Sequence, residues 1–418
     1  MSRTTRLVLL VALFAAVFRL PGLSYPGEEY FDEVYHAKTA LQYLRGDEPT
    51  EWVHPPTAKL LIAAGIALFG YQPWSWRLAP AVAGILIAPL FLLLARRVLA
   101  TERAALFATL LLLMDGVYLV QSRIAMTNIF AVLFQLLSAL LLLRAATADE
   151  LRLADMTALG VALGLALSTR WTSLFAWGFL GLVYLALRRA RALRPRELAQ
   201  GALAFVLLPA AVYLLSYVPW MAQAHPRDLN AWCERIGAAV AWQRAIWGYH
   251  AHLNATHTYF SPWWTWPWLY RPAWYFWFSG DGFVRGIVAL GNPAIWWASV
   301  PVSVWALATG IRWRDPRRIF CGAGFFLLYL PWGLSPRTLN FSHYLLEAIP
   351  YACLSLGSLL DRRWNDGQAL FARGYLVTVA VLFLLFLPLL TAIPVPLGLW
   401  SFRFPTGGGL WTWFPTWI

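Results

Sequence analysis

Long apolar runs separated by short arginine-bearing segments are the feature of this sequence that most limits its fold. A helix needs about 20 apolar residues to cross a membrane, and a chain without barrel-like alternation has no other way to satisfy its backbone in lipid. Only 13% of the residues are charged and 60% are hydrophobic, which excludes an ordinary soluble globular protein. We therefore predict an all-α polytopic membrane protein. Its roughly eleven spans are expected near residues 6–21, 75–95, 104–121, 127–144, 155–169, 171–187, 200–219, 286–311, 318–334, 340–360 and 372–392.

The positive charge gives these spans a direction. A net charge of +13 would suit a nucleic-acid-binding protein, but the arginines fall in short clusters between apolar runs, so no nucleic-acid partner is expected. Residues 1–23 begin like a signal peptide, yet no small-residue cleavage site follows, so they are interpreted as a retained first span. With the amino terminus in the cytoplasm, the arginine-rich loops share that side. These loops are 95–103, 144–155, 188–197, 312–318 and 361–373.

Two long segments then face outward, residues 22–74 and residues 220–285, and an outer carboxy-terminal tail follows at 393–418. The apolar run 57–70 is too short to cross comfortably. An interfacial or re-entrant helix is preferred there, and a pair of tightly packed short helices stays open. The second segment carries SPWWTWPWLYRPAWYFWF, which fits an aromatic belt at the membrane interface as well as a substrate platform.

Ionisable residues at membrane depth are costly, and here they gather on the outward side. Asp115 and Arg123 are expected to face the same way, because eight residues are about two turns of one helix. An arginine at a helix end can simply extend to lipid headgroups, but Arg123, Arg170 and Arg337 on a face where arginine is scarce favour a bound anion such as phosphate. The outward group comprises Asp32, Glu33, Glu51, His54, Lys59, Asp115, Arg123, Arg170, Arg337 and His343.

The adjacent acids Asp32 and Glu33 also allow a simpler interpretation. Acids are favoured in the first turn of a helix, so the pair could merely begin the helix that follows. His36 and Lys38 are expected on the solvated side of that helix. The helix start explains where the acids lie, but not the arginines and histidines predicted around them.

Three histidines of the segment HAHLNATH raise the question of a metal. His250, His252 and His257 could form a metal site, but no acidic ligand completes a tight shell, so hydrogen-bonded loop histidines are preferred. No cofactor is expected, and a divalent metal is possible but not favoured.

A carboxylate opposite phosphate-binding arginines fits a displacement at a carbon that carries a phosphate leaving group. One acid would take the proton from an incoming hydroxyl, while cations stabilise the charge on the departing phosphate. A long lipid phosphate could lie along the helices with its headgroup at the outer surface, which would explain a membrane-embedded catalyst.

Seven motifs occur in order along almost the whole chain. They are FDEVYHAK, HPPTAKLLI with FGYQPWSWR, DGVYLVQSRIAMTN, GLALGLALSTRWT, HTYFSPWWTWPW with its following RP, GNPAIWW, and PRTLNFSHYLLEAIPY. This series resembles the protein O-mannosyltransferase family, the dolichyl- or polyprenyl-phosphate-mannose-dependent enzymes of the GT-C glycosyltransferase class. The resemblance implies one GT-C transmembrane domain over residues 1–418. It also implies inverting transfer of mannose from a polyprenyl-phosphate donor to Ser or Thr hydroxyls of a polypeptide.

The resemblance also implies roles for single residues. Asp32 matches the first acid of the family's pair, expected to act as the base, and Glu33 matches the second, expected to support the site. Arg123, Arg170 and Arg337 are expected to hold the donor phosphate, although the position of Arg170 is usually lysine in the family. The remaining motif positions are expected to bind substrate: His54, Lys59, Asp115, His257, Trp263 and His343.

Three departures from the family pattern stand out. Residues 220–285 are too few for the soluble β-trefoil module of eukaryotic members, which resembles the bacterial branch and implies a bacterial plasma membrane with the active site on the periplasmic face. Asn128 stands where an aspartate is common, and Glu347 where the family often has proline. These departures leave the identity of the sugar and of the acceptor open.

Two other functions compete. An enzyme of similar architecture could modify a lipid or a glycan instead of a protein, as the aminoarabinose lipid transferases do. A transporter or lipid flippase could also bury charges, but the sequence shows no repeats and places its charges on one side.

Overall fold

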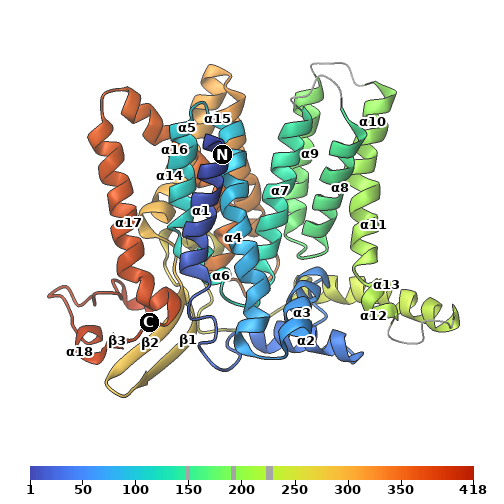
Figure 1. The fold of residues 1–418 in the computed structure, drawn as a ribbon, viewed down its shortest axis with the longest axis horizontal. Helices are drawn as coiled ribbons and strands as arrows, with labels where there is room; N and C mark the ends of the chain where they lie inside the picture. Colours follow the sequence, from blue (N-terminus) through green and yellow to red (C-terminus); the bar gives the residue numbers. More distant parts are fainter. Residues whose placement is uncertain (147–150, 190–193, 223–228) are drawn as a thin grey trace.

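A computed structural model describes residues 1–146, 151–189, 194–222 and 229–418. The predicted loops 144–155 and 188–197 and the predicted outer segment 220–285 therefore lie partly outside the described residues. The described chain is mostly helical (Figure 1).

A bundle of long helices forms the body of the molecule, and a helix lies over each predicted span (Figure 1). Proline occupies the first position of α4, α10, α14 and α15, where its missing N–H has no helical partner to lose. A π-helical stretch, Leu203–Leu207, joins α10 to α11. The bundle helices are α1 (Arg3–Arg19), α4 (Pro73–Val98), α5 (Glu102–Leu113), α7 (Asn128–Ala146), α8 (Leu153–Leu167), α9 (Ser173–Arg189), α10 (Pro195–Ala202), α11 (Leu208–Leu215), α14 (Pro293–Trp313), α15 (Pro316–Tyr329), α16 (Ile349–Asn365) and α17 (Ala369–Thr391).

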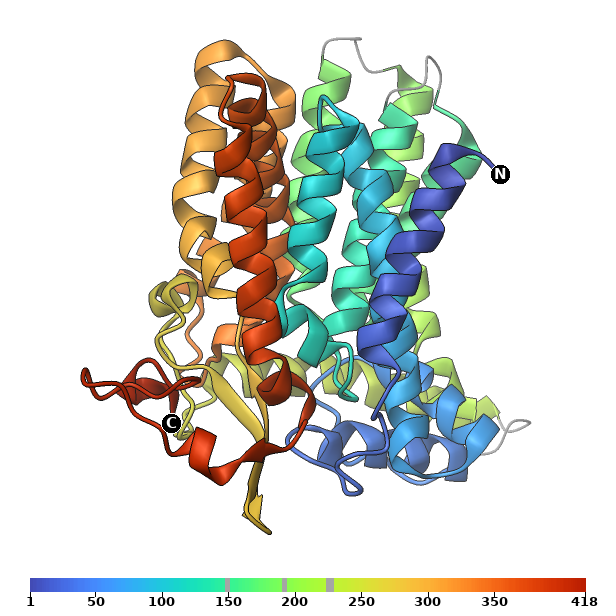
Figure 2. The same ribbon diagram turned by 60° about the vertical axis from the view of Figure 1, so that its left-hand side comes forward.

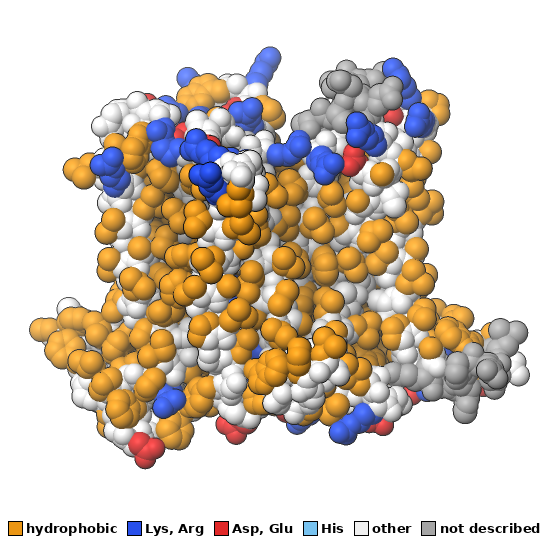
Figure 3. Space-filling model, in the orientation of Figure 1, with side chains coloured by type: hydrophobic (Ala, Val, Ile, Leu, Met, Phe, Trp, Pro, Cys, Tyr) orange, Lys and Arg blue, Asp and Glu red, His pale blue; other side chains and the backbone are white. Residues whose placement is uncertain are grey.

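Length and composition allow five helical stretches of the described chain to cross a membrane on their own: Pro73–Val98, Asn128–Ala145, Pro195–Ala222, Pro293–Trp313 and Ala369–Thr391. Lys and Arg side chains gather at the end of the bundle that carries the amino terminus (Figure 3). The connections α4–α5, α14–α15 and α16–α17 lie at this end, which is called the basic end below (Figure 1). This one-sided distribution is the pattern of a multi-pass integral membrane protein.

The opposite end carries the short elements and is called the site end. Figure 2 shows the β1–β2 hairpin projecting from it. The strands pair antiparallel in the order β1-β2-β3, with Ala273 opposite Ala289. The long helix α13 (Leu229–His252) also lies at this end (Figure 1). The short elements are α2 (Glu33–Arg45), α3 (Thr57–Phe69), α6 (Gly116–Gln121), α12 (Val218–Ala222), η2 (Trp263–Trp268), β1 (Ala273–Gly280), β2 (Phe283–Ala289), η3 (Leu330–Leu334), η4 (Ser342–Glu347), β3 (Val395–Pro396), α18 (Leu397–Trp400) and η5 (Pro415–Trp417).

Three predicted spans differ from the observed helices. The run 104–121 is broken, because α5 ends at Leu113 and Asp115 caps a separate helix, α6, by accepting from the Tyr118 amide. The run 286–311 begins as strand β2, whose apolar residues pair with β1, and becomes helical only at Pro293. The run 340–360 begins with the 3₁₀ turn η4 before α16.

Candidate active site

The two adjacent acids of the first outer loop have different surroundings. Asp32 precedes α2 with helical backbone angles, φ −76° and ψ −4°, and its side chain does not cap the helix. No group of the described chain donates a hydrogen bond to its carboxylate, which is only partly exposed. Burial and the neighbouring Glu51 carboxylate raise the pKa of Asp32 to about 6, against the opposing fields of Arg170 and Arg337.

Glu33 is fully buried, and its carboxylate is saturated. The Arg77 guanidinium donates to both oxygens, with Nε and Nη2 each 2.8 Å away, and the Ala125 amide donates at 3.0 Å. The other N–H groups of Arg77 donate hydrogen bonds to backbone carbonyls of the loop that leads to α2. Burial is the main influence on Glu33 and raises its pKa, while the pair with Arg77 acts against it. Glu33 therefore ties α2 to α4 and to the segment before α7.

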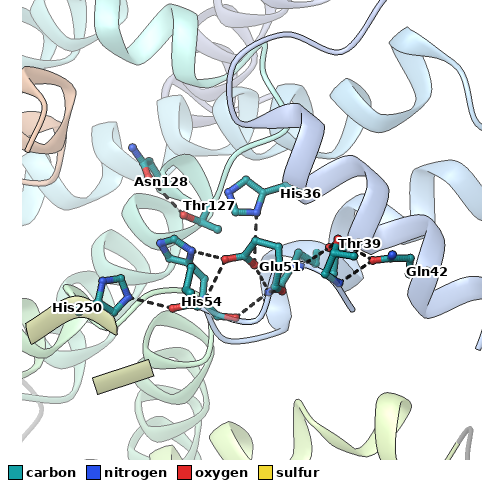
Figure 4. A network of polar contacts seen from close by, with 11 residues as sticks. His36, Thr39, Gln42, Glu51, His54, Thr127, Asn128 and His250 are labelled. Carbon is teal, nitrogen blue, oxygen red and sulfur yellow. Dashed lines mark hydrogen bonds and ion pairs between the residues drawn. The ribbon is translucent and has the colours of Figure 1, made fainter. Parts of the chain in front are cut away.

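Glu51 is the centre of a second buried network (Figure 4). Its carboxylate contacts the Lys59 ammonium and, at 2.7 Å, His54 Nδ1. Lys59 also donates to the carbonyls of Glu51 and His54, so its ammonium is fully used inside the protein. Although burial favours the neutral acid, Lys59 and His54 hold the pKa of Glu51 well below its usual range.

His36 belongs to the same network, which corrects the expectation that it lies on the solvated side of α2. It is 3% exposed, and its Nδ1 lies 3.8 Å from Glu51 Oε2, because α2 turns this face toward the 51–56 segment (Figure 4). Burial lowers the pKa of His36 to about 3. Lys38 does lie on the exposed side, where it pairs with Glu29 at 3.2 Å.

A cavity of about 190 Å³ opens beside this network. Arg170 and Arg337 lie in its wall together with His54 and His250. Much of the remaining lining is apolar and comes from the start of α9, the residue before it and later outer elements: Trp171, Leu174, Phe175, Trp247 and Trp332. The cavity thus combines two cations with an apolar wall at the level of the outer helix ends.

Arg170 is held from three directions. Its Nη1 donates to Asn128, its Nε lies 3.7 Å from Glu347 Oε1, and its guanidinium lies 4.6 Å from the centre of the Tyr344 ring. Asn128 and Glu347, at two positions where the family often has a different residue, both contact Arg170, whose own position is usually lysine. Glu347 also accepts from Thr172 and Gln135.

Arg337 is held by His250. Its Nη1 lies 3.3 Å from His250 Nδ1, while His250 Nε2 lies 3.0 Å from the Val53 carbonyl. The carbonyl requires a hydrogen on Nε2, so Nδ1 accepts from Arg337. Burial, followed by the influence of His54, lowers the pKa of His250 to about 4.

Arg123 and Asp115 do not share a helix face, contrary to expectation. The break at Asp115 places one residue before α6 and the other after it. Arg123 Nη1 donates to the carbonyls of Phe18, Arg19 and Pro21, at the carboxyl end of α1. Asp115 accepts from the amides of Tyr118 and Asn292 and from the Trp296 indole. Both side chains connect helices, and neither lines the cavity.

The remaining predicted residues surround Phe31 or lie farther away. His343 is 1% exposed, and neither of its ring nitrogens has a hydrogen-bond partner among the described residues. The centre of its ring lies 6.3 Å from that of Phe31. His257 is exposed, and its ring also lies 6.3 Å from Phe31. Trp263 packs on Tyr329 at 5.3 Å, outside the cavity lining.

The three histidines considered for a metal diverge. His250 faces Arg337, His252 contacts the Gly248 carbonyl, and His257 accepts from the Tyr259 amide. Within the described residues, no group of three His, Cys, Asp or Glu side chains could hold a metal ion.

Sequence reasoning gave Arg77 no role, placed Glu51 in the outward group without a partner, and considered His250 only as a metal ligand or a hydrogen-bonded loop histidine. Arg77 could have been noticed as a cation near the start of an apolar span, where a charge needs a partner. His250 carries no such signal, because its partners Val53 and Arg337 come from other segments. Glu51 meets His54 and Lys59 within its own segment, so its short spacing to Lys59 was a usable signal.

The chain matches known proteins over almost its full length. A family profile described as dolichyl-phosphate-mannose-protein mannosyltransferase matches residues 9–222. A second, described as the C-terminal four-transmembrane region of protein-O-mannosyltransferase, matches residues 236–402. The polyprenol-phosphate-mannose–protein mannosyltransferase of Mycolicibacterium smegmatis is 28% identical over 481 residues, 98% of this chain and 92% of the relative. The protein of the same name from Corynebacterium glutamicum is 28% identical over 488 residues, with the same two coverages of 98% and 92%.

A solved structure shows the same fold. The Saccharomyces cerevisiae protein O-mannosyltransferase Pmt1-Pmt2 complex bound to the sugar donor matches with a TM-score of 0.83 at 16% identity, covering 100% of this chain and 93% of that chain. This likeness confirms the predicted GT-C fold.

Proposed function

Because the chain belongs to the dolichyl-phosphate-mannose–protein mannosyltransferase family, we propose that it moves a mannosyl residue from a polyprenyl-phosphate donor to Ser or Thr hydroxyls of a polypeptide. The observation that carries the mechanism is the carboxylate of Asp32. It accepts no hydrogen bond from the described chain, its pKa is raised, and it lies within the fields of Arg170 and Arg337.

Asp32 acts as the general base. The acceptor hydroxyl gives its proton to Asp32 while its oxygen attacks the anomeric carbon of the sugar. The bond from that carbon to the phosphate oxygen breaks, and the polyprenyl phosphate leaves with the electron pair. A single displacement from the opposite face inverts the anomeric configuration. A raised pKa suits the role, because a base is most useful when its pKa is close to the working pH.

Arg170 and Arg337 receive the phosphate of the donor. They are the two cations of the cavity wall, and charge on the departing phosphate grows as the bond breaks. Leu174, Phe175 and Trp332 form an apolar exit beside them, between α9 and η3, that suits the polyprenyl chain. Arg123, expected from the sequence to share this role, is not included, because its Nη1 holds the end of α1.

Glu33, His54 and Lys59 are assigned to support. Arg77 saturates Glu33, and Glu51 engages both His54 and Lys59, so these groups fix the loop that carries Asp32. The whole chain forms one transmembrane domain in this proposal. It lies in a bacterial plasma membrane with its basic end in the cytoplasm and the site on the outer face.

Transfer of labelled mannose tests the function. Membranes containing the protein are incubated with labelled polyprenyl-phosphate mannose and a Ser/Thr-containing peptide, and label is expected on the peptide. Two controls are matched to this assay: the same peptide with every Ser and Thr replaced by Ala, and membranes with Asp32→Asn. Label on lipid or glycan, with none on peptide, would replace the polypeptide acceptor by a different one.

A further inference from the structure

Phe31, directly before Asp32, has a backbone conformation that side-chain-bearing residues rarely adopt. Its φ is +51°, in the left-handed region. Four other described non-glycine residues share this region, and each ends a helix or turns a hairpin: Leu269, Asp281, Arg314 and Ala392. Phe31 instead stands at the beginning of a helix, where no such conformation is needed.

Aromatic neighbours hold the Phe31 ring. It stacks on Tyr275 of β1 with ring centres 4.1 Å apart and planes 23° apart. The rings of Phe341 and His343 are packed edge-to-face against it, with ring centres 6.1 and 6.3 Å away. Tyr275 is itself fixed, because Gln121 Nε2 lies 2.6 Å from its hydroxyl. The ring is thus gripped by segments about 240 to 310 residues further along the chain, which can hold a backbone angle that local preference opposes.

The conformation of Phe31 decides what Asp32 can do. An aspartate before a helix normally has extended backbone angles, and its carboxylate then accepts from an amide of the first turn. Asp115 does this at the start of α6, with ψ 131° and a 2.9 Å contact to the Tyr118 amide. Asp32 already has helical angles and makes no such bond, because the chain reverses one residue earlier, at Phe31.

We propose that Phe31 is a positioning residue for Asp32. The aromatic contacts of the Phe31 ring keep the backbone of Phe31 in the left-handed region, so the Asp32 carboxylate does not cap α2. The carboxylate therefore stays available to the acceptor hydroxyl. The proposal rests on the proposed function of Asp32 as base. It makes the stack on Tyr275 part of the machinery that prepares the base.

Phe31→Ala tests the proposal. Without the ring, residue 31 is expected to relax to an extended conformation, and Asp32 then caps α2. We expect kcat to fall about tenfold or more, because the base is occupied, while donor Kd stays within about threefold. The capping amides would stabilise the carboxylate, so the acid limb of the kcat–pH profile is expected to move to lower pH. The groups that act on Asp32, namely Glu51, Arg170, Arg337 and Tyr275, are unchanged in this variant.

Two further variants separate positioning from general damage. Phe31→Tyr keeps the stacking ring and is expected to restore kcat and the pH profile. Arg314→Gly removes a positive-φ side chain, φ +53°, at the exposed end of α14 and is expected to leave kcat unchanged. Wild-type kcat in Phe31→Ala would overturn the proposal, as would a loss of kcat with an unmoved pH profile.

A double variant keeps this result separate from the proposed function. If Asp32 is the base, adding Phe31→Ala to Asp32→Asn has no further effect on kcat. Full activity of Asp32→Asn alone would refute the role of Asp32 as base. A further loss of kcat in the double variant would instead refute the claim that Phe31 acts through Asp32.

Discussion

At the scale of single residues, the adjacent acids Asp32 and Glu33 differ in their hydrogen-bond partners. Glu33 has a guanidinium on both oxygens and two amides besides, so it has no free lone pair for an acceptor hydroxyl. Asp32, one residue before it, accepts nothing from the described chain. The two residues are both carboxylates, so the different roles proposed for them follow from hydrogen-bond saturation and not from chemical type.

Asp32→Asn is expected to abolish mannosyl transfer while donor Kd stays within about threefold, because the amide keeps the shape but cannot take a proton. The measurements are peptide labelling and binding of the lipid donor. Asp281→Asn, at the exposed turn of the β1–β2 hairpin, is the matched control and should keep full activity. Loss of donor binding in Asp32→Asn would contradict the assignment as base.

The pH dependence of the wild-type rate follows from the same carboxylate. Burial and Glu51 raise the pKa of Asp32 to about 6, and the base works only when deprotonated. The initial rate at saturating donor should therefore be on a plateau above about pH 7 and fall about tenfold per pH unit well below 6. A rate that stays constant down to pH 4.5, about where an unperturbed carboxylate begins to protonate, would argue against this base.

Two arginines predicted to hold the same phosphate should behave differently. Arg170→Ala removes a cation of the cavity wall and is expected to weaken donor binding about 10- to 100-fold, from a charge-assisted contact of about 1.5–3 kcal/mol. Arg123→Ala should leave donor Kd almost unchanged and lower Tm, because it strips three carbonyls at the end of α1. The measurements are donor Kd and Tm of both variants. Equal weakening of donor binding in the two variants would show that Arg123 also binds the donor phosphate.

At the scale of elements, the short helix α2 is fixed by a clamp to the long helix α4. Arg77, 1% exposed near the start of α4, donates to Glu33 and to carbonyls of the loop 23–28. The clamp holds the first turn of α2 against the bundle, and with it the backbone of Asp32. The residue proposed as the base is thereby attached to a helix of the bundle.

Arg77→Met is expected to destabilise the fold by about 3–5 kcal/mol, because it leaves the buried Glu33 carboxylate without a counter-charge. Adding Glu33→Gln should recover part of this loss, since no uncompensated charge remains, although the loop carbonyls still lack their donor. Thermal unfolding in detergent measures both variants. Strictly additive losses in the double variant would show that the two side chains do not act as a pair.

At the scale of the whole molecule, the clustered Lys and Arg side chains and the proposed site lie at opposite ends. Lys and Arg gather at the basic end (Figure 3), whereas the hairpin and α2, which begins at the two acids, lie at the site end (Figures 1 and 2). In the proposed orientation, a membrane between these ends separates the site from the cytoplasm. The proposed acceptor is then a polypeptide that has already crossed the bilayer.

Thiol labelling of intact cells tests this orientation. Cys233 lies on α13 at the site end and is exposed, whereas Cys321 and Cys353 are buried. A membrane-impermeant maleimide should therefore label the native protein at Cys233. In a Cys233→Ser background, Arg314→Cys at the basic end should stay unlabelled until the cells are opened. The reverse pattern would place the site in the cytoplasm.

The sequence by itself determined the membrane-spanning architecture, the one-sided charge, the family and the neighbourhood in which the acids lie. Hydropathy and charge act along the chain, so a run of apolar residues or a cluster of arginines keeps its meaning wherever the chain folds. The placement of the helices over the predicted spans follows from this.

Only the tertiary structure decided which side chains are occupied and which are free. Glu33 meets Arg77 across 44 residues, Arg123 meets the end of α1 across about 100, and Phe31 meets Tyr275 across about 240. The expectation that Asp115 and Arg123 share a helix face was wrong, because the helix breaks before Asp115, which caps α6, and α6 ends before Arg123. Saturation of a buried polar group depends on partners that folding brings from elsewhere, and no spacing along the chain records them.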